Sequence, residues 1–410
     1  MSKRLHIAYV CADRGVPIGG YKGASAHVAE LTQALTRLDA EVRTVAVRAV
    51  EDAATSVIDL GKDRAARQMR QTVFAAARGP RQQAKAAEVY GLLVNQYLAH
   101  ELDRLHRRWH IDAVYERYSL WSYAAANFAR SERLPYLLEV NAPLREEQRR
   151  YRSLDNRAAA EGLESYLFRS ADHVLVPSAE LRPYVVGRGA AARRVHVMPN
   201  AADPEAFALP RVRRDDGTFV IGFLGTLKPW HGVEDLVTAF RRLHRVFPGY
   251  RLLFAGDGPL RPQLQRRLRQ YGLDGAATFC GEVDHAGVPE KLAQMDIGVA
   301  PYPRLAGFYF SPLKIFEYMA AGLPVVASDI GQPGEILTHG KNALLHRPGA
   351  ATELAARIEE LRRDPALAQR LGRAGRAMVR RRFTWRRNAQ RVLALIQRHQ
   401  HPVGGANGSV

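Results

Sequence analysis

The sequence predicts an α/β protein built from two Rossmann-like, doubly wound domains. Short apolar, β-branched runs alternate with amphipathic helical patterns along nearly the whole chain, which is the pattern of parallel βαβ units. The length of 410 residues exceeds the usual size of one domain. An apolar content of 47% is that of an ordinary globular protein and excludes general disorder and fibrous structure.

Two series of strands follow from this alternation. They are predicted at residues 5–10, 42–47, 113–116, 136–140, 173–177 and 195–198, and at residues 219–224, 251–255, 277–280, 297–300, 324–327 and 343–345. Each series suffices for one doubly wound domain. A polar, turn-rich stretch around Pro204 and Pro210 separates the two series and predicts a linker. The polar tail 399–410 is predicted to be disordered.

The chain is strongly basic, with a formal net charge of +19. Such a charge favours anionic small molecules, an anionic membrane surface or nucleic acid as partners. Much of it lies in two basic helical stretches: residues 62–85 hold seven cations and one acid, and residues 373–398 hold nine arginines and no acid. Each stretch fits either a solvated helix face or a surface for phosphates and lipid headgroups.

The sequence gives no sign of export or of membrane insertion. The apolar run at residues 5–10 is shorter than a signal-peptide core, and no stretch reaches the ~18 apolar residues of a membrane-spanning helix. Cys11 and Cys280 match no disulfide framework and no metal-ligand spacing. We therefore expect a cytoplasmic protein, which would lie on the inner face of the plasma membrane if the basic stretches bind lipid.

A glycine-rich loop follows the first strand. Gly15, Gly19, Gly20 and Gly23 lie between this strand and a helix, where backbone amides and the helix N-terminus can receive an anion. Many α/β proteins use such a loop merely to turn tightly. The glycine spacing differs from that of the dinucleotide fingerprint, and no acid closes the second strand, which disfavours an oxidoreductase.

The second half begins with a similar arrangement. The strand 219–224 leads into Gly225 and then into Lys228, Trp230 and His231. A lysine at the carboxyl end of a parallel strand lies where open α/β sheets bind ligands, and it suits a phosphate. Taken alone, the loop also fits a surface lysine beside a buried tryptophan.

A third segment reads FYFSPLKIFEYMAAGLPVV. Ser311 and Pro312 suit the N-cap and first position of a helix, with the free amides of Leu313 and Lys314 directed at an anion. Glu317 follows Lys314 by three residues and shares its side of the helix. The segment therefore offers a cation for a phosphate and a carboxylate for a sugar hydroxyl. The alternative is an ordinary helix–turn–strand packing unit.

These segments resemble a known family, the retaining glycosyltransferases of family four (glycosyl transferases group 1), which have the GT-B fold. The matching segments are VHVMPNAADPEAF, IGFLGTLKPWHGVEDL, LLFAGDGPLRPQL, FCGEVDHAGVPEKLAQMDIGVAPY and SPLKIFEYMAAGLPVVASD, in the family's order. The glycine-rich opening and LLEVNAPL match more loosely. The resemblance implies domains at 1–203 and 219–380, a linker at 204–218, and a C-terminal helix at 381–398 that crosses back to the first domain.

The resemblance also implies roles for single residues. The turn of Ser311, Pro312, Leu313 and Lys314 would hold the donor diphosphate, and Glu317 would bind the ribose. Lys228 would contact the phosphates from the facing loop after Gly225. The remaining donor contacts are Gly19 and Gly20 on the β-phosphate and Gly281 and Val283 near the base, while Asn200 and Asp203 mark the turn between the domains.

Three positions depart from the family pattern. Tyr309 stands where the first acid of the family's Glu-x7-Glu motif is expected, so the family's sugar contacts do not carry over directly, and the tyrosine hydroxyl is a candidate partner for the sugar. Thr226 and His231 occupy the positions where many members have an arginine and a lysine, which leaves Lys228 as the evident cation and His231 as a candidate helper in donor binding. The family histidine after the strand 136–140 is absent, and Glu139 lies nearby. An inactive relative remains an alternative.

The expected chemistry is transfer of a hexose from a UDP- or GDP-linked donor to a glycan, lipid-linked or small-molecule acceptor. The leaving diphosphate needs stabilisation of its charge, which Lys228, Lys314 and helix amides supply without a metal or other cofactor. The proposed phosphate loops contain no Asp-x-Asp cluster, and retention of configuration follows from the resemblance alone. Glu139 is a candidate for contacting or deprotonating the acceptor, or else a strand-end carboxylate paired with an arginine such as Arg145.

Two other classes of protein fit the charge but not the motifs. A nucleic-acid-binding protein would show a recognition module or regularly interleaved aromatic residues, and neither appears, so nucleic acid is not an expected partner. A catalytically inactive, basic membrane-surface scaffold would use the basic helices but would have no need of SPLKIFE.

Overall fold

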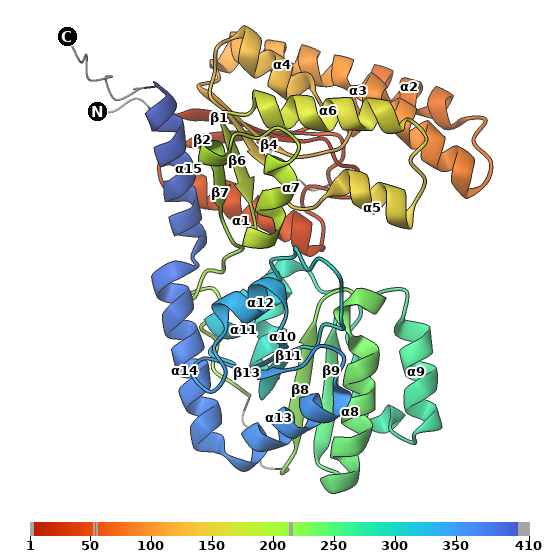
Figure 1. Cartoon of the computed structure of the whole chain (residues 1–410), viewed down its shortest axis with the longest axis vertical. Coiled ribbons are helices and arrows are strands. Elements are labelled where there is room, and N and C mark those ends of the chain that lie inside the picture. Colours follow the sequence, from red (N-terminus) through yellow and green to blue (C-terminus); the bar gives the residue numbers. More distant parts are fainter. Residues whose placement is uncertain (1–3, 52–53, 55, 213–215, 401–410) are drawn as a thin grey trace, which may run out of the picture. The chain divides into compact units, whose positions relative to one another are not determined.

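The computed structural model describes residues 4–51, 54, 56–212 and 216–400. The chain forms two compact units (Figure 1). The first comprises the described parts of Met1–Gly20, Ala24–Met198 and Asn388–Val410, and the second comprises Tyr21–Gly23 and Pro199–Arg387. Each unit contains one parallel sheet with helices around it, which confirms the predicted fold of two Rossmann-like, doubly wound domains.

The sheet of the first unit has the order β3-β2-β1-β4-β5-β6-β7. Its strands are β1 (His6–Cys11), β2 (Glu41–Ala46), β3 (Val57–Asp59), β4 (Ala113–Arg117), β5 (Tyr136–Glu139), β6 (His173–Val176) and β7 (Val195–Val197). The sequence pattern predicts all of them except β3, which pairs in parallel with β2 through only three residues. The switch of strand order between β1 and β4 is the doubly wound arrangement.

Apolar residues of β1 and β4 form the centre of this first sheet. Tyr9 and Tyr115 are fully buried, and their rings stack with centroids 5.1 Å apart. The helices of this unit are α1 (Gly23–Thr36), α2 (Arg64–Phe74), α3 (Gly79–Trp109), α4 (Ala124–Ser131), α5 (Leu144–Tyr151), α6 (Arg157–Ser170), α7 (Arg182–Val186) and α15 (Trp385–Gln400).

The sheet of the second unit has the order β10-β9-β8-β11-β12-β13. Its strands are β8 (Phe219–Leu224), β9 (Tyr250–Ala255), β10 (Ala277–Phe279), β11 (Ile297–Ala300), β12 (Val325–Ser328) and β13 (Leu344–His346). Side chains alternate between two cores, because Ile221 and Phe223 of β8 belong to one cluster while Val220 and Leu224 belong to the other. All six strands agree with the predicted positions to within one residue.

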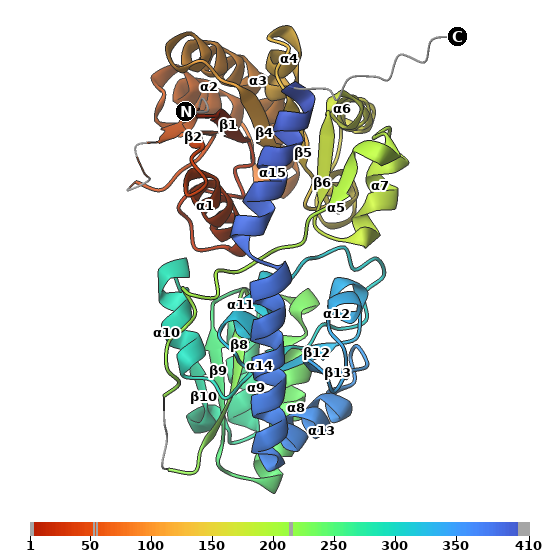
Figure 2. The same ribbon diagram turned by 90° about the vertical axis from the view of Figure 1, so that its left-hand side faces the viewer.

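Helices cover both faces of this second sheet. They are α8 (Val233–Val246), α9 (Arg261–Gln270), α10 (Val288–Ala293), α11 (Leu313–Ala320), α12 (Gly331–Ile336), α13 (Ala351–Arg363) and α14 (Pro365–Arg382). Helices α8, α9 and α13 contribute to one core cluster, α10 and α11 contribute to the other, and α14 contributes to both. Figure 2 shows α14 crossing in front of the sheet.

The C-terminal basic stretch forms two helices rather than one. Helix α14 ends at Arg382 and α15 begins at Trp385, so the predicted helix 381–398 is interrupted. Large apolar side chains of this region, among them Phe383, Trp385 and Ile396, are buried in the protein. Helix α15 continues to Gln400, so residues 399 and 400 are helical rather than disordered; the rest of the predicted tail, 401–410, lies outside the described residues.

The other basic stretch, residues 62–85, is also helical and contains α2 and the start of α3. Within the described part of the chain, no helix is long and apolar enough to cross a membrane.

Candidate functional site

The predicted phosphate loops of the second unit lie at the switch point of its sheet. Strands β8 and β11 are neighbours in the sheet, and the strand order reverses between them. The loop after β8 carries Lys228, and the chain after β11 leads to α11 and Lys314. Both segments therefore start from the carboxyl edge of the sheet, where open α/β sheets bind their ligands.

Glycines allow the loop after β8 to pack closely against its neighbours. Gly232 has a φ of +67°, and a Cβ built there would lie 1.6 Å from the Pro301 carbonyl oxygen. Gly225 has a φ of +120°, and its Cβ would lie 3.3 Å from Lys314 Nζ. Both positions therefore need glycine, and the backbone at Gly225 runs directly beside the Lys314 ammonium group.

Lys228 and His231 lie on this loop and differ in charge. Lys228 Nζ lies 4.8 Å from the centre of the Trp230 ring, which is exposed rather than buried. Burial, together with the positive charges of Lys314 and Lys228, lowers the pKa of His231 to about 3. His231 is therefore neutral at physiological pH. Because its Nδ1 faces the Thr226 carbonyl oxygen, Nδ1 carries the proton and Nε2 is an acceptor.

The start of α11 is one residue later than predicted. Pro312 is the cap residue and Leu313 the first helical residue, whereas the sequence placed Ser311 at the N-cap and Pro312 at the first position. The Ser311 hydroxyl instead accepts a hydrogen bond from the Asn200 backbone N–H at 2.9 Å. The amides of Leu313 and Lys314 remain in the first turn, where an α-helix provides no acceptor of its own.

Lys314 is the most unusual group of the site. Its residue is only 8% exposed, and its ammonium nitrogen has no hydrogen-bond partner within the described residues. Its Nζ lies 4.0 Å from the centre of the Phe223 ring and 5.6 Å from that of Tyr302. Burial lowers the pKa of Lys314 to about 7, although the charge of Glu317 acts in the opposite direction. An anion at the start of α11 would provide the missing partner.

Glu317 lies one turn further along α11. Its residue is 3% exposed, and its Oε1 lies 3.6 Å from His285 Nδ1. The ring of His285 also makes an edge-on contact with Phe207, with centroids 6.3 Å apart. Glu317 is thus held in place by His285, from the segment after β10; the sequence pointed to Gly281 and Val283 of this segment but not to the histidine.

The other predicted donor contacts lie on nearby elements of the second unit. Gly281 has a φ of +76° and forms an isolated bridge with Gly256, while Val283 packs against the core cluster that contains α11. Tyr309 is half-buried in the chain that leads to α11, with its ring 4.4 Å from that of Phe310. The structure therefore gathers these residues around one end of the sheet. Their contacts with a donor stay predictions.

The glycine-rich loop after β1 is fixed by backbone hydrogen bonds. Ile18 N–H donates to the Arg48 carbonyl oxygen, and Gly20 N–H donates to that of Pro17, both at 3.0 Å. Gly19 has a φ of +80°, and a Cβ there would lie 2.6 Å from a Val50 methyl group. The Gly20 amide is thus engaged within the loop, and the predicted contact of Gly19 and Gly20 with a phosphate stays a prediction.

Glu139 ends β5 in a buried cluster of polar side chains. Its Oε1 lies 2.9 Å from His27 Nε2 and 2.9 Å from Arg117 Nη1, and it also accepts hydrogen bonds from Tyr115 and Asn141. Burial would raise the pKa of Glu139, but the charges of His27 and Arg117 and these hydrogen bonds hold it well below its usual range. An acid this strong is a weak proton acceptor, so its predicted role as a base is disfavoured.

The arginine partner of Glu139 is Arg117, and not Arg145 as the sequence suggested. Arg145 pairs instead with Glu164, whose Oε2 lies 3.0 Å from its Nε. Two functional candidates were missed, His27 and His285. Both are single histidines without a motif, and only the fold shows that each faces a buried carboxylate. Among the described residues, no group of three or more His, Cys, Asp and Glu side chains could hold a metal ion.

Comparisons with known proteins match both halves of the chain to glycosyltransferase families. The family model described as Glycosyl transferases group 1 matches residues 218–364, and the model described as Glycosyl transferase 4-like domain matches residues 22–201. Glycogen synthase of Mycobacterium tuberculosis is 28% identical over 282 residues, which are 68% of this chain and 67% of the relative.

Solved structures of similar fold cover nearly the whole chain. Sucrose-phosphate synthase from Thermosynechococcus elongatus has a TM-score of 0.70 at 20% identity, over 96% of this chain and 99% of its own. Anabaena Alr3699/HepE in complex with UDP and glucose has a TM-score of 0.68 at 19% identity, over 96% and 100%. These likenesses show the GT-B fold. The two family models, which together match residues 22–201 and 218–364, show that the chain is a glycosyltransferase and belongs to the group 1 glycosyl transferases.

Proposed function

We propose that this protein transfers a sugar from a nucleoside-diphosphate sugar, UDP- or GDP-linked, to a glycan, lipid-linked or small-molecule acceptor in glycan biosynthesis. The observation that carries the proposal is the buried Lys314 ammonium group at the start of α11, which has no partner among the described residues. A nucleotide sugar brings a diphosphate that suits this place. The complexes of Anabaena Alr3699/HepE with UDP and with UDP-glucose support the same class of donor.

The diphosphate would be held from two sides. Lys314 and the first-turn amides of α11 supply positive charge from one segment, and Lys228 supplies it from the loop after β8. The charges of both lysines lower the pKa of His231, which supports a common phosphate site. As the bond between sugar and diphosphate breaks, negative charge grows on the leaving oxygen, and groups fixed in advance stabilise that charge in the transition state.

Glu317 would bind the ribose of the donor. Its carboxylate lies on α11 one turn after the phosphate-binding amides, and His285 fixes its orientation. A carboxylate accepts hydrogen bonds from two neighbouring hydroxyls, which distinguishes a ribose from a lone phosphate. Gly281 and Val283 would lie beside the base, and Tyr309 would contact the sugar through its hydroxyl group.

We propose that transfer is metal-independent and retains the anomeric configuration. The lysines and helix amides take the place of a divalent cation as the source of positive charge, and no cofactor is required. Retention rests on the family alone. The acceptor would bind to the first unit, and a cytoplasmic location, peripheral at an anionic membrane surface, would suit a lipid-linked acceptor.

Thermal-shift measurements with UDP, GDP, ADP and NAD test the donor assignment. Stabilisation by a nucleoside diphosphate in the presence of EDTA is expected, because a ligand that binds only the folded state raises its melting temperature. Lys228→Ala and Glu317→Ala should lose transfer while keeping the fold, and Lys341→Ala, which removes an exposed lysine of the same unit, should behave as wild type. No response to any nucleotide would contradict the proposal.

A further inference from the structure

A second basic site lies in the first unit, and its lining shares no residue with the predicted donor site, although Arg14 lies on the same loop as Gly19 and Gly20. A cavity of about 320 Å³ opens where the chain leaves the carboxyl ends of β1, β2 and β3. Its walls carry four arginines: Arg14, Arg48, Arg67 and Arg70. The volume is at the lower end of the range of small-molecule sites, and carboxyl ends of parallel strands are where such sites form.

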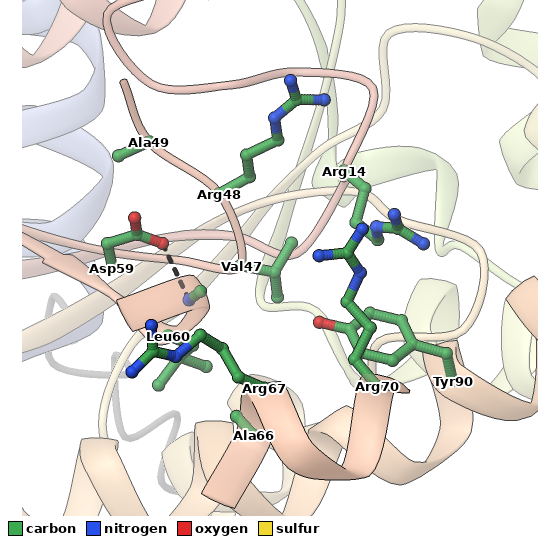
Figure 3. A pocket seen from close by; sticks show the side chains of 11 residues that line it. Arg14, Val47, Arg48, Ala49, Asp59, Leu60, Ala66, Arg67, Arg70 and Tyr90 are labelled. Carbon is green, nitrogen blue, oxygen red and sulfur yellow. Dashed lines mark hydrogen bonds between the residues drawn. The ribbon is translucent and has the colours of Figure 1, made fainter. Parts of the chain in front are cut away.

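The four arginines come from three separate parts of the chain (Figure 3). Arg14 lies in the loop after β1 and Arg48 in the segment after β2, while Arg67 and Arg70 are three residues apart on α2. Arg14 is the most enclosed of them, with its guanidinium carbon 5.1 Å from the ring centres of both Phe74 and Tyr90. The fold therefore gathers positive charge that the sequence distributes over more than fifty residues.

Little negative charge balances these arginines. Among the described residues that line the cavity, Asp59 is the one acid, and its carboxylate accepts a hydrogen bond from the Gly61 backbone N–H at 2.8 Å. Among the described residues, none of the four guanidinium groups forms an ion pair. Burial and the nearby charges of Arg70 and Arg48 lower the pKa of Arg14. The charges of Arg70 and Arg48 thus disfavour the charge of Arg14, and a bound anion would offset this repulsion.

We propose that this cavity binds the phosphate group of a phosphate ester, and that the ester belongs to the acceptor. One guanidinium group can bind two phosphate oxygens at once through two parallel hydrogen bonds. Four arginines around one cavity therefore match a doubly charged phosphate better than a singly charged carboxylate. The remaining space accommodates part of a sugar or polyol. The assignment to the acceptor rests on the proposed transferase function, whereas anion binding itself does not.

Calorimetry on the full chain at low salt tests the site. Glucose 6-phosphate and inorganic phosphate are expected to bind, and glucose is not. Arg70→Gln and Arg14→Gln should each weaken binding about tenfold or more, because each removes a charge-assisted pair of hydrogen bonds. Arg64→Gln is the matched control: this exposed arginine lies on the same helix outside the cavity, and its loss should change binding less than twofold.

Two further measurements are needed. Vesicle binding distinguishes a lipid headgroup from a free sugar phosphate, and UDP binding tests the transferase proposal separately from the anion site. Binding to vesicles of phosphatidylcholine with phosphatidylinositol that Arg70→Gln weakens would identify a lipid headgroup, and binding of the soluble ester alone would identify a free sugar phosphate. UDP stabilisation should survive Arg70→Gln and be lost in Lys314→Met. If UDP fails to bind but the phosphate esters still bind, the assignment of the ester to the acceptor is rejected and the anion site itself is kept. If Arg14→Gln and Arg70→Gln bind every phosphate probe as Arg64→Gln does, the site is refuted.

Discussion

Binding of a nucleoside diphosphate should draw a proton into the protein at Lys314. The pKa of this buried lysine is about 7 in the free protein, against about 10.5 for an ordinary lysine. A diphosphate beside the ammonium group supplies the negative charge it lacks and moves its pKa back towards the ordinary value. The donor should therefore bind the charged lysine and take up a proton whenever the free lysine is neutral.

The size of the effect follows from the pKa. With a pKa of about 7, roughly 0.9 of the Lys314 side chains are neutral at pH 8 and about 0.1 at pH 6. Lys314 should therefore take up about 0.9 protons per UDP bound at pH 8 and about 0.1 at pH 6. If the bound lysine stays charged, affinity falls about 50-fold between pH 7 and pH 9, because only the charged fraction binds.

Isothermal titration calorimetry in buffers of different ionisation enthalpy measures this uptake. Lys314→Met keeps an apolar side chain of similar length and cannot be protonated, so it should bind UDP weakly, with proton uptake reduced to that of the nucleotide itself. The variant should also have a higher melting temperature than wild type below pH 7, because it no longer buries an unpaired charge.

Two results would refute this reasoning. Equal proton uptake at pH 8 by wild type and Lys314→Met would show that Lys314 does not titrate on binding. Equal affinity of the two proteins at pH 6.5 would show that the diphosphate binds elsewhere. Arg64→Gln is again a suitable control, because this exposed arginine lies in the other unit and its loss should change neither quantity.

Three other predictions concern stability and can be checked by thermal or urea unfolding. Gly232→Ala should destabilise the fold by about 3 kcal/mol or more, because its Cβ would collide with the Pro301 carbonyl at a positive φ, whereas Gly275→Ala, with nothing within 4 Å, should stay within about 0.5 kcal/mol. Burial lowers the pKa of His173 to about 4, so the folded state disfavours its charged form; the protein should lose stability as the pH falls from about 6.5 to 4, and His173→Gln should reduce that loss. Glu139→Gln should cost about 3 kcal/mol, because it leaves buried positive charges unpaired, and an unchanged melting temperature would contradict the role of this carboxylate in the cluster.

The strands other than β3 were predictable because each lies in a local run of mostly apolar residues that is long enough to distinguish from a turn. β3 has only three residues, so nothing in its composition distinguishes it from a turn, and only its pairing with β2 defines it. The cavity with four arginines was missed for the same reason, because part of its wall is formed by residues 59–61 at the end of β3. The sequence did place cations in residues 62–85, but it could not show that Arg14 and Arg48 join two of them.

At the predicted donor site, the sequence identified the segments but not their long-range contacts. Ser311 is a good N-cap residue by its type, yet Asn200, over a hundred residues earlier, uses its hydroxyl group. Glu139 has many arginines nearby in sequence, and the fold pairs it with Arg117 on the neighbouring strand. Long-range contacts of this kind depend on which segments the fold brings together, and a local sequence pattern does not predict that.

Release of nucleoside diphosphate from a panel of UDP- and GDP-sugars, followed in EDTA, tests the central claim most directly. The account predicts that at least one donor is cleaved without a metal. It also predicts that this release is lost in Lys314→Met and in Lys228→Ala, and is unchanged in Lys341→Ala. Release that requires a divalent cation, or that continues at the wild-type rate in Lys314→Met, would contradict it.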